Sequence, residues 1–173
     1  MHLYIIDTGA LLSQWTLKNP HFAFMTTQSV IDEIQNRPSK NRVQNLLSTD
    51  RLRIESPDAD AIKMTEQKAR EVGDYNVLSS EDLELVSLAL WQKQLGHDVS
   101  VVSSDLAVLN TAAALGLSTL DPKRRMREEI TWVLKCPGCR NEEPEGAINL
   151  ECPVCGTIML RKPKRKKKIK GSK

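Results

Sequence analysis

LYIIDTG, at residues 3–9, shows the pattern on which the fold of most of the chain depends. Its four apolar residues predict a short buried strand that ends at Asp7-Thr8-Gly9, after which ALLSQW starts a helix. FAFMTT, at residues 22–27, repeats this order ahead of the helical start SVIDEI. DVSVVSSD, at residues 98–105, repeats it ahead of a helix at residues 106–115. Alternating strands and helices predict an α/β fold in which helices flank a parallel sheet.

The middle of the chain continues the alternation. LRIES, at residues 52–56, predicts a shorter strand, and residues 58–72 have the periodicity of a helix. The next helix has clear ends, because Ser79 is placed as its N-cap, Asp82 stands at the third helical position and Gly96 stops it. We therefore expect the α/β domain to occupy residues 1–120.

All four cysteines lie between residues 136 and 155, in the two knuckles CPGC and CPVCG. Two Cys-x-x-Cys pairs match tetrahedral structural zinc, because thiolate is a soft ligand that favours Zn²⁺. A redox dithiol and an iron–sulfur cluster are the alternatives. We expect a small β zinc ribbon at residues 130–160, where Zn²⁺ is structural because no ligand position remains for substrate. Its ligands would be Cys136, Cys139, Cys152 and Cys155.

Basic residues concentrate at the C-terminal end. Residues 161–173 hold nine Lys or Arg and no acid, and because the whole chain carries +3, the remainder carries −6. This split is typical of proteins that bind nucleic acid, although a merely solvated tail is the alternative. We expect a charged linker at residues 121–129 and a flexible tail at residues 161–173. The candidate phosphate contacts are Lys123, Arg124, Arg125, Arg127, Lys135, Arg140, Arg161, Lys162, Lys164 and Arg165.

Carboxylates recur where the predicted strands end. Asp7 and Asp105 each follow a strand, at the sheet edge where α/β proteins bind ligands. Glu33 and Asp82 lie near the starts of helices expected over the same edge. Converging carboxylates require a cation, and oxygen ligands suit Mg²⁺ or Mn²⁺. Taken singly, each acid is also explained as a helix cap or a solvated residue.

Two uncertainties concern this acidic set. Glu81 and Glu84 flank Asp82 and are alternative ligands. Asp7-Thr8-Gly9 also matches the aspartic-protease signature, but that class of enzyme needs a β-rich body and a second such triplet, and this sequence offers neither. Trp132 is the main candidate for base stacking in the ribbon, although a place in the ribbon core is the more usual role.

These motifs together resemble a PIN domain. The resemblance rests on Asp7-Thr8-Gly9 after the first strand, on Val30, Glu33 and Ile34, on Leu78, Ser79 and Asp82, and on Ser103 and Asp105. It implies that Asp7, Glu33, Asp82 and Asp105 are the catalytic residues and bind a divalent metal. It also implies nuclease activity, with Thr8 and Ser103 as hydroxyl groups next to the metal or phosphate.

A PIN domain followed by a four-cysteine ribbon resembles the Nob-type endonucleases, and the lack of long insertions makes the chain similar to archaeal members. The resemblance implies cleavage of precursor small-subunit (16S) rRNA at its 3′ end, with the pre-ribosomal small subunit as partner. A non-catalytic RNA-binding assembly factor and a toxin-type RNase are the alternatives. The ribbon counts against the toxin, which is usually a bare nuclease domain.

Targeting signals are not evident. No stretch approaches the ~18 apolar residues of a membrane span. MHLYIID lacks the basic and long apolar regions of a signal peptide. We therefore expect a cytoplasmic protein with no membrane partner.

Overall fold

The computed structural model describes residues 2–123, 125–145 and 150–169. Its larger sheet has five parallel strands in the order β3-β2-β1-β4-β5. The two central strands are buried on both faces, and their residues Ile5, Ile6 and Val101 are fully inaccessible to solvent. The strands are β1 (His2–Ile6), β2 (Ala23–Thr26), β3 (Leu52–Ile54), β4 (Asp98–Val102) and β5 (Ser118–Leu120).

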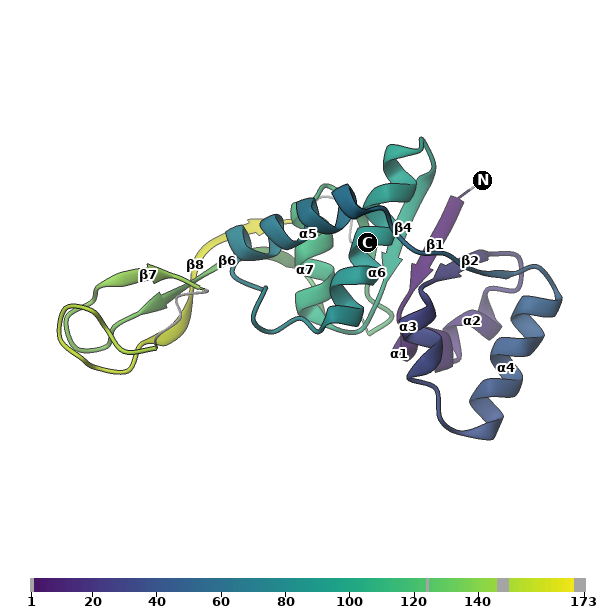
Figure 1. Cartoon of the computed structure of the whole chain (residues 1–173), viewed down its shortest axis with the longest axis horizontal. Helices are drawn as coiled ribbons and strands as arrows, with labels where there is room; N and C mark the ends of the chain where they lie inside the picture. Colours follow the sequence, from purple (N-terminus) through teal and green to yellow (C-terminus); the bar gives the residue numbers. More distant parts are fainter. Residues whose placement is uncertain (1, 124, 146–149, 170–173) are drawn as a thin grey trace.

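Helices connect these strands and pack on the sheet in two groups (Figure 1). α6 lies against β1 and β4, α7 lies against β4 and β5, and α5 packs on both helices, whereas α1 contacts β1 and α4 contacts β3. No helix within the described ranges is long and apolar enough to cross a membrane. The helices are α1 (Thr8–Leu12), α2 (Trp15–Lys18), α3 (Gln28–Asp32), α4 (Arg37–Ser48), α5 (Ala59–Val72), α6 (Ser80–Gln94) and α7 (Leu106–Ala114).

The predicted fold class is confirmed, as is the best-defined helix start. The hydroxyl of Ser79 accepts the backbone N–H of Asp82 at 3.1 Å, and Oδ2 of Asp82 accepts the N–H of Ser79 at 3.1 Å. This reciprocal pair is a complete capping box. One strand, β5, was not predicted, because it has only three residues and follows the helix stop at Gly116 so closely.

A second, antiparallel sheet has the order β7-β6-β8. It projects from the side of α5 and α7, and its far end carries the cysteine knuckles (Figure 1). Its strands are β6 (Glu128–Lys135), β7 (Glu142–Pro144) and β8 (Leu160–Lys168). The predicted strand ITWVLKC therefore lies in β6, which starts two residues earlier than expected.

The expected flexible tail is wrong for residues 161–168, which form most of β8. This strand pairs with β6 from Leu160–Lys135 to Lys168–Glu128. Ladder hydrogen bonds satisfy the backbone, and Glu128 and Glu129 of β6 lie 3.6 Å from the ammonium groups of Lys166 and Lys167. The lack of apolar side chains predicted disorder, but a strand can be held by its ladder and by opposite charges on its neighbour. Residues 170–173 lie outside the described residues.

The segment at residues 121–129 joins the two sheets, as expected of a linker, but it is anchored. The carboxylate of Asp121 accepts the backbone N–H groups of Lys123, Arg125 and Met126 at 2.8, 2.6 and 3.1 Å. Although burial raises the pKa of Asp121, these amides lower it below its ordinary value. The side chain of Met126 is buried, and the Arg125 guanidinium donates to the carbonyl of Ser104 at the end of β4, so this connection is bound to the large sheet.

Gly73, at the C-cap of α5, allows β6 of the small sheet to approach the end of this helix. Its φ of +77° is left-handed, and an added Cβ would lie 2.9 Å from both the Cβ and the carbonyl oxygen of Trp132 in β6. We expect Gly73→Ala to lower the free energy of unfolding by about 2–4 kcal/mol, because backbone strain adds to overpacking.

Gly96→Ala is the matched control for this prediction. Gly96 has a φ of +89°, but no atom lies within 4 Å of its hypothetical Cβ, so only the strain of about 1 kcal/mol should appear. Urea unfolding of both variants measures the difference. Equal losses at the two sites would contradict the close approach of Gly73 to β6.

Candidate active site and metal centre

The carboxyl edge of the large sheet joins Asp7 to Ser103. Ile6 pairs with Val102, so the next residues of β1 and β4, Asp7 and Ser103, stand side by side. The Ser103 hydroxyl donates to Oδ2 of Asp7 at 2.5 Å and accepts the N–H of Asp105 at 2.8 Å. One buried hydroxyl therefore bonds the carboxylate of Asp7 and the backbone amide of Asp105, and the role of Ser103 next to a metal or phosphate stays a prediction.

Asp7 is the most constrained acid at this edge. Its Oδ1 accepts the N–H of Ala10, which makes it the N-cap of α1. Burial raises the pKa of Asp7 above its ordinary value, against the hydrogen bonds from Ser103 and Ala10, and the charge of Asp82 adds to the rise. A buried carboxylate next to another acid gains most from a bound cation.

The raised pKa gives a stability prediction with a defined sign. Because the pKa of Asp7 is higher in the folded state than in the unfolded state, the ionised side chain lowers the free energy of unfolding at pH values above the unfolded pKa. Without added Mg²⁺ or Mn²⁺, we expect Asp7→Asn to raise Tm at pH 7, by roughly 2–4 °C for each kcal/mol recovered. The gain should shrink to nothing as the pH falls below the ordinary aspartate pKa.

Asp60→Asn serves as the control, because Asp60 is a fully exposed acid in the first turn of α5. It should give no gain in Tm at either pH. A Tm of Asp7→Asn at or below that of the wild type at pH 7 would show that the Asp7 charge is not a burden in the metal-free protein.

The other three predicted acids are each held by a hydrogen bond. Oε2 of Glu33 accepts the Thr8 hydroxyl, Oδ2 of Asp82 belongs to the capping box, and Oδ1 of Asp105 accepts the N–H of Ala107 at 2.7 Å. Glu33 is at the C-cap of the five-residue α3, not near the start of a longer helix. That expectation was wrong because α3 stops after Asp32.

The carboxylates do not form a compact cluster. Within the described part of the chain, the four cysteines are the one group of three or more such side chains with ligand atoms all within 4.8 Å of one another. Mg²⁺ keeps several of its water ligands when it binds between a protein and a substrate phosphate. The carboxylates that bind it therefore do not need to touch one another. The catalytic assignment of Asp7, Glu33, Asp82 and Asp105 stays a prediction.

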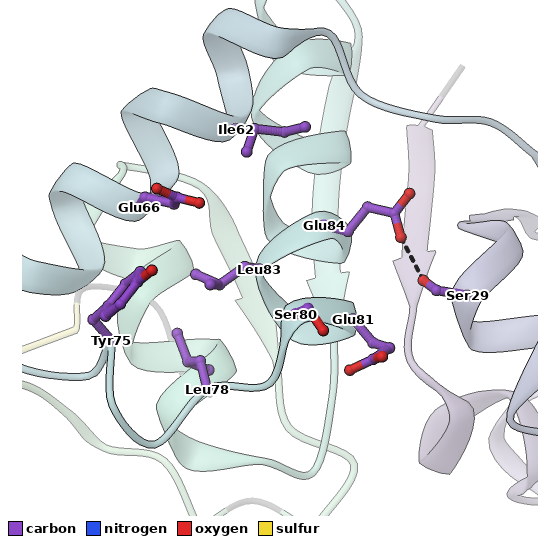
Figure 2. Close-up of a pocket in the computed structure, with 9 residues that line it drawn as sticks. All are labelled: Ser29, Ile62, Glu66, Tyr75, Leu78, Ser80, Glu81, Leu83 and Glu84. Carbon is purple, nitrogen blue, oxygen red and sulfur yellow. Dashed lines mark hydrogen bonds between the residues drawn. The ribbon is translucent and has the colours of Figure 1, made fainter.

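A cleft of about 570 Å³ lies beside α6 (Figure 2). Tyr75, Leu78 and Leu83 line one side of it, with Glu66 above Tyr75, and Glu81 and Glu84 line the other side. The Ser29 hydroxyl donates to Oε2 of Glu84 at 2.5 Å. This bond ties α6 to α3, the helix that ends next to Glu33, so Glu84 remains an alternative to Asp82.

Sequence reasoning missed Ser29 in this arrangement. The sequence feature that could have identified Ser29 is its spacing to Glu33, because residues four apart lie on one face of a helix. Ser29 Oγ is also within 2.8 Å of the Thr27 hydroxyl, which places a short chain of hydroxyl groups between the end of β2 and Glu84. Such groups orient carboxylates for ligand binding.

The cysteine centre fits a tetrahedral metal. All four cysteines are free thiols, with Sγ–Sγ distances of 3.4 Å for Cys136–Cys155 and 3.5 Å for Cys139–Cys152. A tetrahedral ion with Zn–S bonds of ~2.3 Å holds its sulfurs ~3.8 Å apart, and a disulfide would need ~2 Å. The predicted cluster is confirmed, and its donor set suits zinc.

Tight turns shape both knuckles. The N–H of Arg140 donates to the carbonyl of Cys136 at 3.0 Å, and the N–H of Gly156 donates to that of Cys152 at 2.8 Å. Arg140 and Gly156 hold the same place after their cysteines, and both have left-handed φ values, of 66° and 73°. Gly138 serves differently, because a Cβ there would lie 3.0 Å from the Thr157 hydroxyl.

The knuckle turns also direct donors at sulfur. The N–H of Cys139 donates to Sγ of Cys136 at 3.4 Å. The Thr157 hydroxyl and its amide, with the neighbouring thiols, lower the pKa of Cys155 to about 6. In the same cluster the Asn141 amide lowers the pKa of Cys139, but burial and the three neighbouring thiols raise it to about 12. Zinc binds cysteine as thiolate, so zinc binding would release the Cys139 proton.

Some of the candidate phosphate contacts are exposed, and others form ion pairs or hydrogen bonds with groups of the protein. Exposed cations include Lys123, Arg127, Lys162 and Arg165. Lys135 and Lys164 lie 3.1 and 3.8 Å from the carboxylate of Glu142. Arg125 is exposed, but its guanidinium donates to the carbonyl of Ser104. Arg140 is exposed in the first knuckle, and Arg124 lies outside the described residues.

Two expectations near the ribbon are wrong. Arg161 is not a free phosphate contact, because its guanidinium forms ion pairs with Asp74 and Glu145. Trp132 belongs neither to a ribbon core nor to an open stacking surface, because the Arg161 guanidinium covers its ring at 4.0 Å. Both errors have one cause: the partner, Asp74, is distant in sequence and lies on the nuclease domain.

Comparison with known proteins agrees with this geometry. The family model described as "PIN domain of ribonuclease" matches residues 4–91. Ribonuclease VapC1 of Thermoplasma acidophilum is 32% identical over 96% of this chain and 81% of its own length. Endoribonuclease Nob1 is 32% identical in Pyrococcus abyssi, over 82% of this chain and 85% of the relative. Endoribonuclease Nob1 of Archaeoglobus fulgidus is 29% identical, over 96% of this chain and 95% of its own length. With strand-end acids on a parallel sheet and a family match over half its length, the chain belongs to the PIN-domain ribonucleases.

Proposed function

We propose that the protein is a divalent-metal-dependent endoribonuclease that cleaves precursor 16S rRNA at its 3′ end. The observation that carries the nuclease assignment is the meeting of Asp7 and Asp105 at the carboxyl edge of β1 and β4, where the Ser103 hydroxyl donates to the Asp7 carboxylate and accepts the backbone N–H of Asp105. The rRNA assignment is supported by the similarity to several archaeal Nob1 endoribonucleases over most of the chain. The pre-ribosomal small subunit is the proposed partner.

Asp7, Glu33, Asp82 and Asp105 are the proposed ligands of Mn²⁺ or Mg²⁺, because their donors are all hard oxygens. A divalent ion at this edge would lower the pKa of water and offset charge that builds on the phosphate. Thr8 and Ser103 hold the carboxylates of Glu33 and Asp7 in place through hydroxyl donors. Water attacks phosphorus in line, the P–O3′ bond breaks, and the products carry a 5′ phosphate and a 3′ hydroxyl.

The ribbon is the proposed RNA grip, and its four cysteines are the proposed ligands of a structural Zn²⁺. Strand β8 exposes Lys162, Lys164 and Arg165 along one edge of the small sheet. Its neighbour β6 carries its acids, Glu128 and Glu129, at the other end of the ladder. Lys164 lies 3.8 Å from Glu142 of β7, and Lys162 and Arg165 are further exposed cations on this edge, where RNA phosphates can be bound.

The salt dependence of RNA binding tests this grip. The slope of log affinity against log salt should be about −0.7 for each phosphate neutralised on single-stranded RNA. Replacing Lys162, Lys164 and Arg165 by Ala together should make the slope shallower by about 2. The matched control removes three exposed cations of the other domain, Lys18, Lys40 and Lys63, and should leave the slope unchanged. Equal slopes for both triple variants would contradict an RNA grip on β8.

The proposed activity is tested with an end-labelled RNA that spans the 3′ end of precursor 16S rRNA. With Mn²⁺ we expect one main cut, and with EDTA in its place we expect none. Sequencing gels of the products establish the position and the 5′ phosphate. Random degradation, or cutting that persists in EDTA, would refute the proposal.

A toxin-type RNase is the second candidate, because the relative named Ribonuclease VapC1 matches 96% of this chain. That match extends into the ribbon region, so an appended ribbon does not separate the two groups. Preferential cleavage of tRNA over precursor rRNA would favour this candidate. Tight RNA binding without cleavage would favour the assembly factor.

A further inference from the structure

The contact between the ribbon and the nuclease domain is centred on Asp74, at the C-terminal end of α5. The Asp74 side chain is 1% exposed. Nη2 of Arg161, on β8, donates to Oδ1 of Asp74 and to the carbonyl of Gly73, both at 2.7 Å. The guanidinium is planar and its donors diverge at fixed angles, so these bonds define an orientation as well as a contact.

The ribbon side of Arg161 is equally constrained. Nε donates to Oε2 of Glu145 at 2.6 Å, and the guanidinium lies over the Trp132 ring. Glu145 follows β7 and Trp132 belongs to β6, so all three strands of the small sheet meet at Arg161. The guanidinium cannot rotate without breaking contacts on both sides.

The nuclease side adds a second fixed group. Nδ2 of Asn110, on α7, donates to Oδ2 of Asp74 at 2.5 Å and to the carbonyl of Ile130 at 2.8 Å. Oδ1 of Asn110 accepts the N–H of Ile130 at 2.6 Å. The carboxamide thus pairs with β6 as a neighbouring strand would, and Gly73 brings the backbone of α5 against Trp132.

We propose that Asp74 and Arg161 are positioning residues that fix β8 relative to the Asp7 edge, so that RNA is cut at a set spacing from the site where it is held. This rests on the proposed function. After Arg161 the strand runs back along β6 to the Lys168–Glu128 pair, toward the anchored segment at residues 121–126. The basic strand is therefore tied to the nuclease domain at both ends, and Figure 1 shows β8 returning toward α5 and α7.

Three variants test the proposal. Arg161→Met removes the guanidinium and leaves a buried acid without its partner, which is destabilising. The double variant Arg161→Met/Asp74→Asn also removes the charge of Asp74 and leaves Asn110 a carbonyl to bond, so that of the two acids only Glu145 loses its partner. It is therefore less destabilised than the single variant and keeps the test valid if the single variant does not fold. Arg165→Met is the matched control, because it removes the same group from an exposed position on the same strand.

Orientation is measured first, by amide residual dipolar couplings, without RNA. The wild type and Arg165→Met should fit a single alignment tensor for both sheets, and the double variant should need two. Cut positions are then mapped on end-labelled single-stranded RNA with Mn²⁺. The wild type should give one main cut, the double variant should spread its cuts over several nucleotides, and Arg165→Met should raise KM without spreading them.

A short oligonucleotide that reaches only the Asp7 edge separates positioning from catalysis. On this substrate the double variant should keep kcat within twofold of the wild type. One tensor and one cut position in the double variant would overturn the proposal, as would two tensors in the wild type. A wild type that binds RNA but never cuts it would refute the proposed function alone, and the tensors would still decide whether Asp74 and Arg161 hold the ribbon in place.

Discussion

Replacing Asp7 by Asn should reduce RNA cleavage by at least a thousandfold, which corresponds to about 4 kcal/mol of transition-state stabilisation. Asp7 is the one predicted acid with hydrogen bonds to both of its oxygens, from Ala10 and Ser103, and its burial raises its pKa. Asn can keep the bond from the Ala10 N–H through its carbonyl oxygen, and its amide can donate to the Ser103 hydroxyl in place of accepting from it, but it brings no negative charge to a divalent cation. The fold should therefore survive while cleavage is lost, as measured by single-turnover cutting of labelled RNA with Mn²⁺.

Asp98→Asn is the control for this loss. Asp98 begins the neighbouring strand β4, at the opposite edge of the same sheet, where it pairs with His2 at 2.6 Å, and its side chain is 75% exposed. Its removal should change the cleavage rate less than twofold. If Asp7→Asn cut RNA as fast as Asp98→Asn, the carboxyl edge of the sheet would not be the catalytic site.

The second large effect is expected on loss of the cysteine centre, which should unfold the ribbon and leave the large sheet folded. Structural zinc supplies on the order of 10 kcal/mol of folding free energy. Among the described residues, the core cluster of the small sheet consists of Leu134, Cys136, Cys152 and Met159. We expect Cys152→Ser to contain no zinc, against one ion per chain in the wild type, by elemental analysis. Its amide NMR signals from residues 134–160 should collapse.

The signals of β1 and β4 should remain dispersed in Cys152→Ser, because the large sheet has a separate core. Asp7→Asn should keep its zinc and its ribbon signals. A Cys152→Ser protein with an ordered ribbon would contradict a structural metal centre. A wild type that purifies with iron in place of zinc would correct the identity of the ion and leave its role intact.

The fold of the first domain was predictable because its signals are local. A run such as LYII is buried on both faces in β1, and the Ser79–Asp82 capping box is formed by residues three apart. β5 was missed because its three residues, STL, have no run of apolar side chains. Its place in the sheet depends on pairing with β4, which lies across α7 in the chain.

The candidate site was predictable to the same extent. The rule that parallel strands bring their carboxyl ends to one edge predicted Asp7 and Asp105 at that edge. The structure adds that β1 and β4 are neighbours and that the Ser103 hydroxyl bonds the Asp7 carboxylate and the Asp105 amide. How the acids are held was not predictable, since the bonds of Thr8 to Glu33 and of Ser29 to Glu84 depend on tertiary packing. Arg161 shows the same limit, because its partner Asp74 lies 87 residues away.

The most direct test of the central claim is the anomalous diffraction of Mn²⁺ in crystals of the wild-type protein soaked with the ion. The account predicts a peak at the carboxyl edge of β1 and β4, with carboxylate oxygens of Asp7 and of at least one other proposed ligand about 2.0–2.2 Å away. The peak should vanish in Asp7→Asn crystals. Mn²⁺ bound only elsewhere on a protein that cuts RNA in solution would contradict the account.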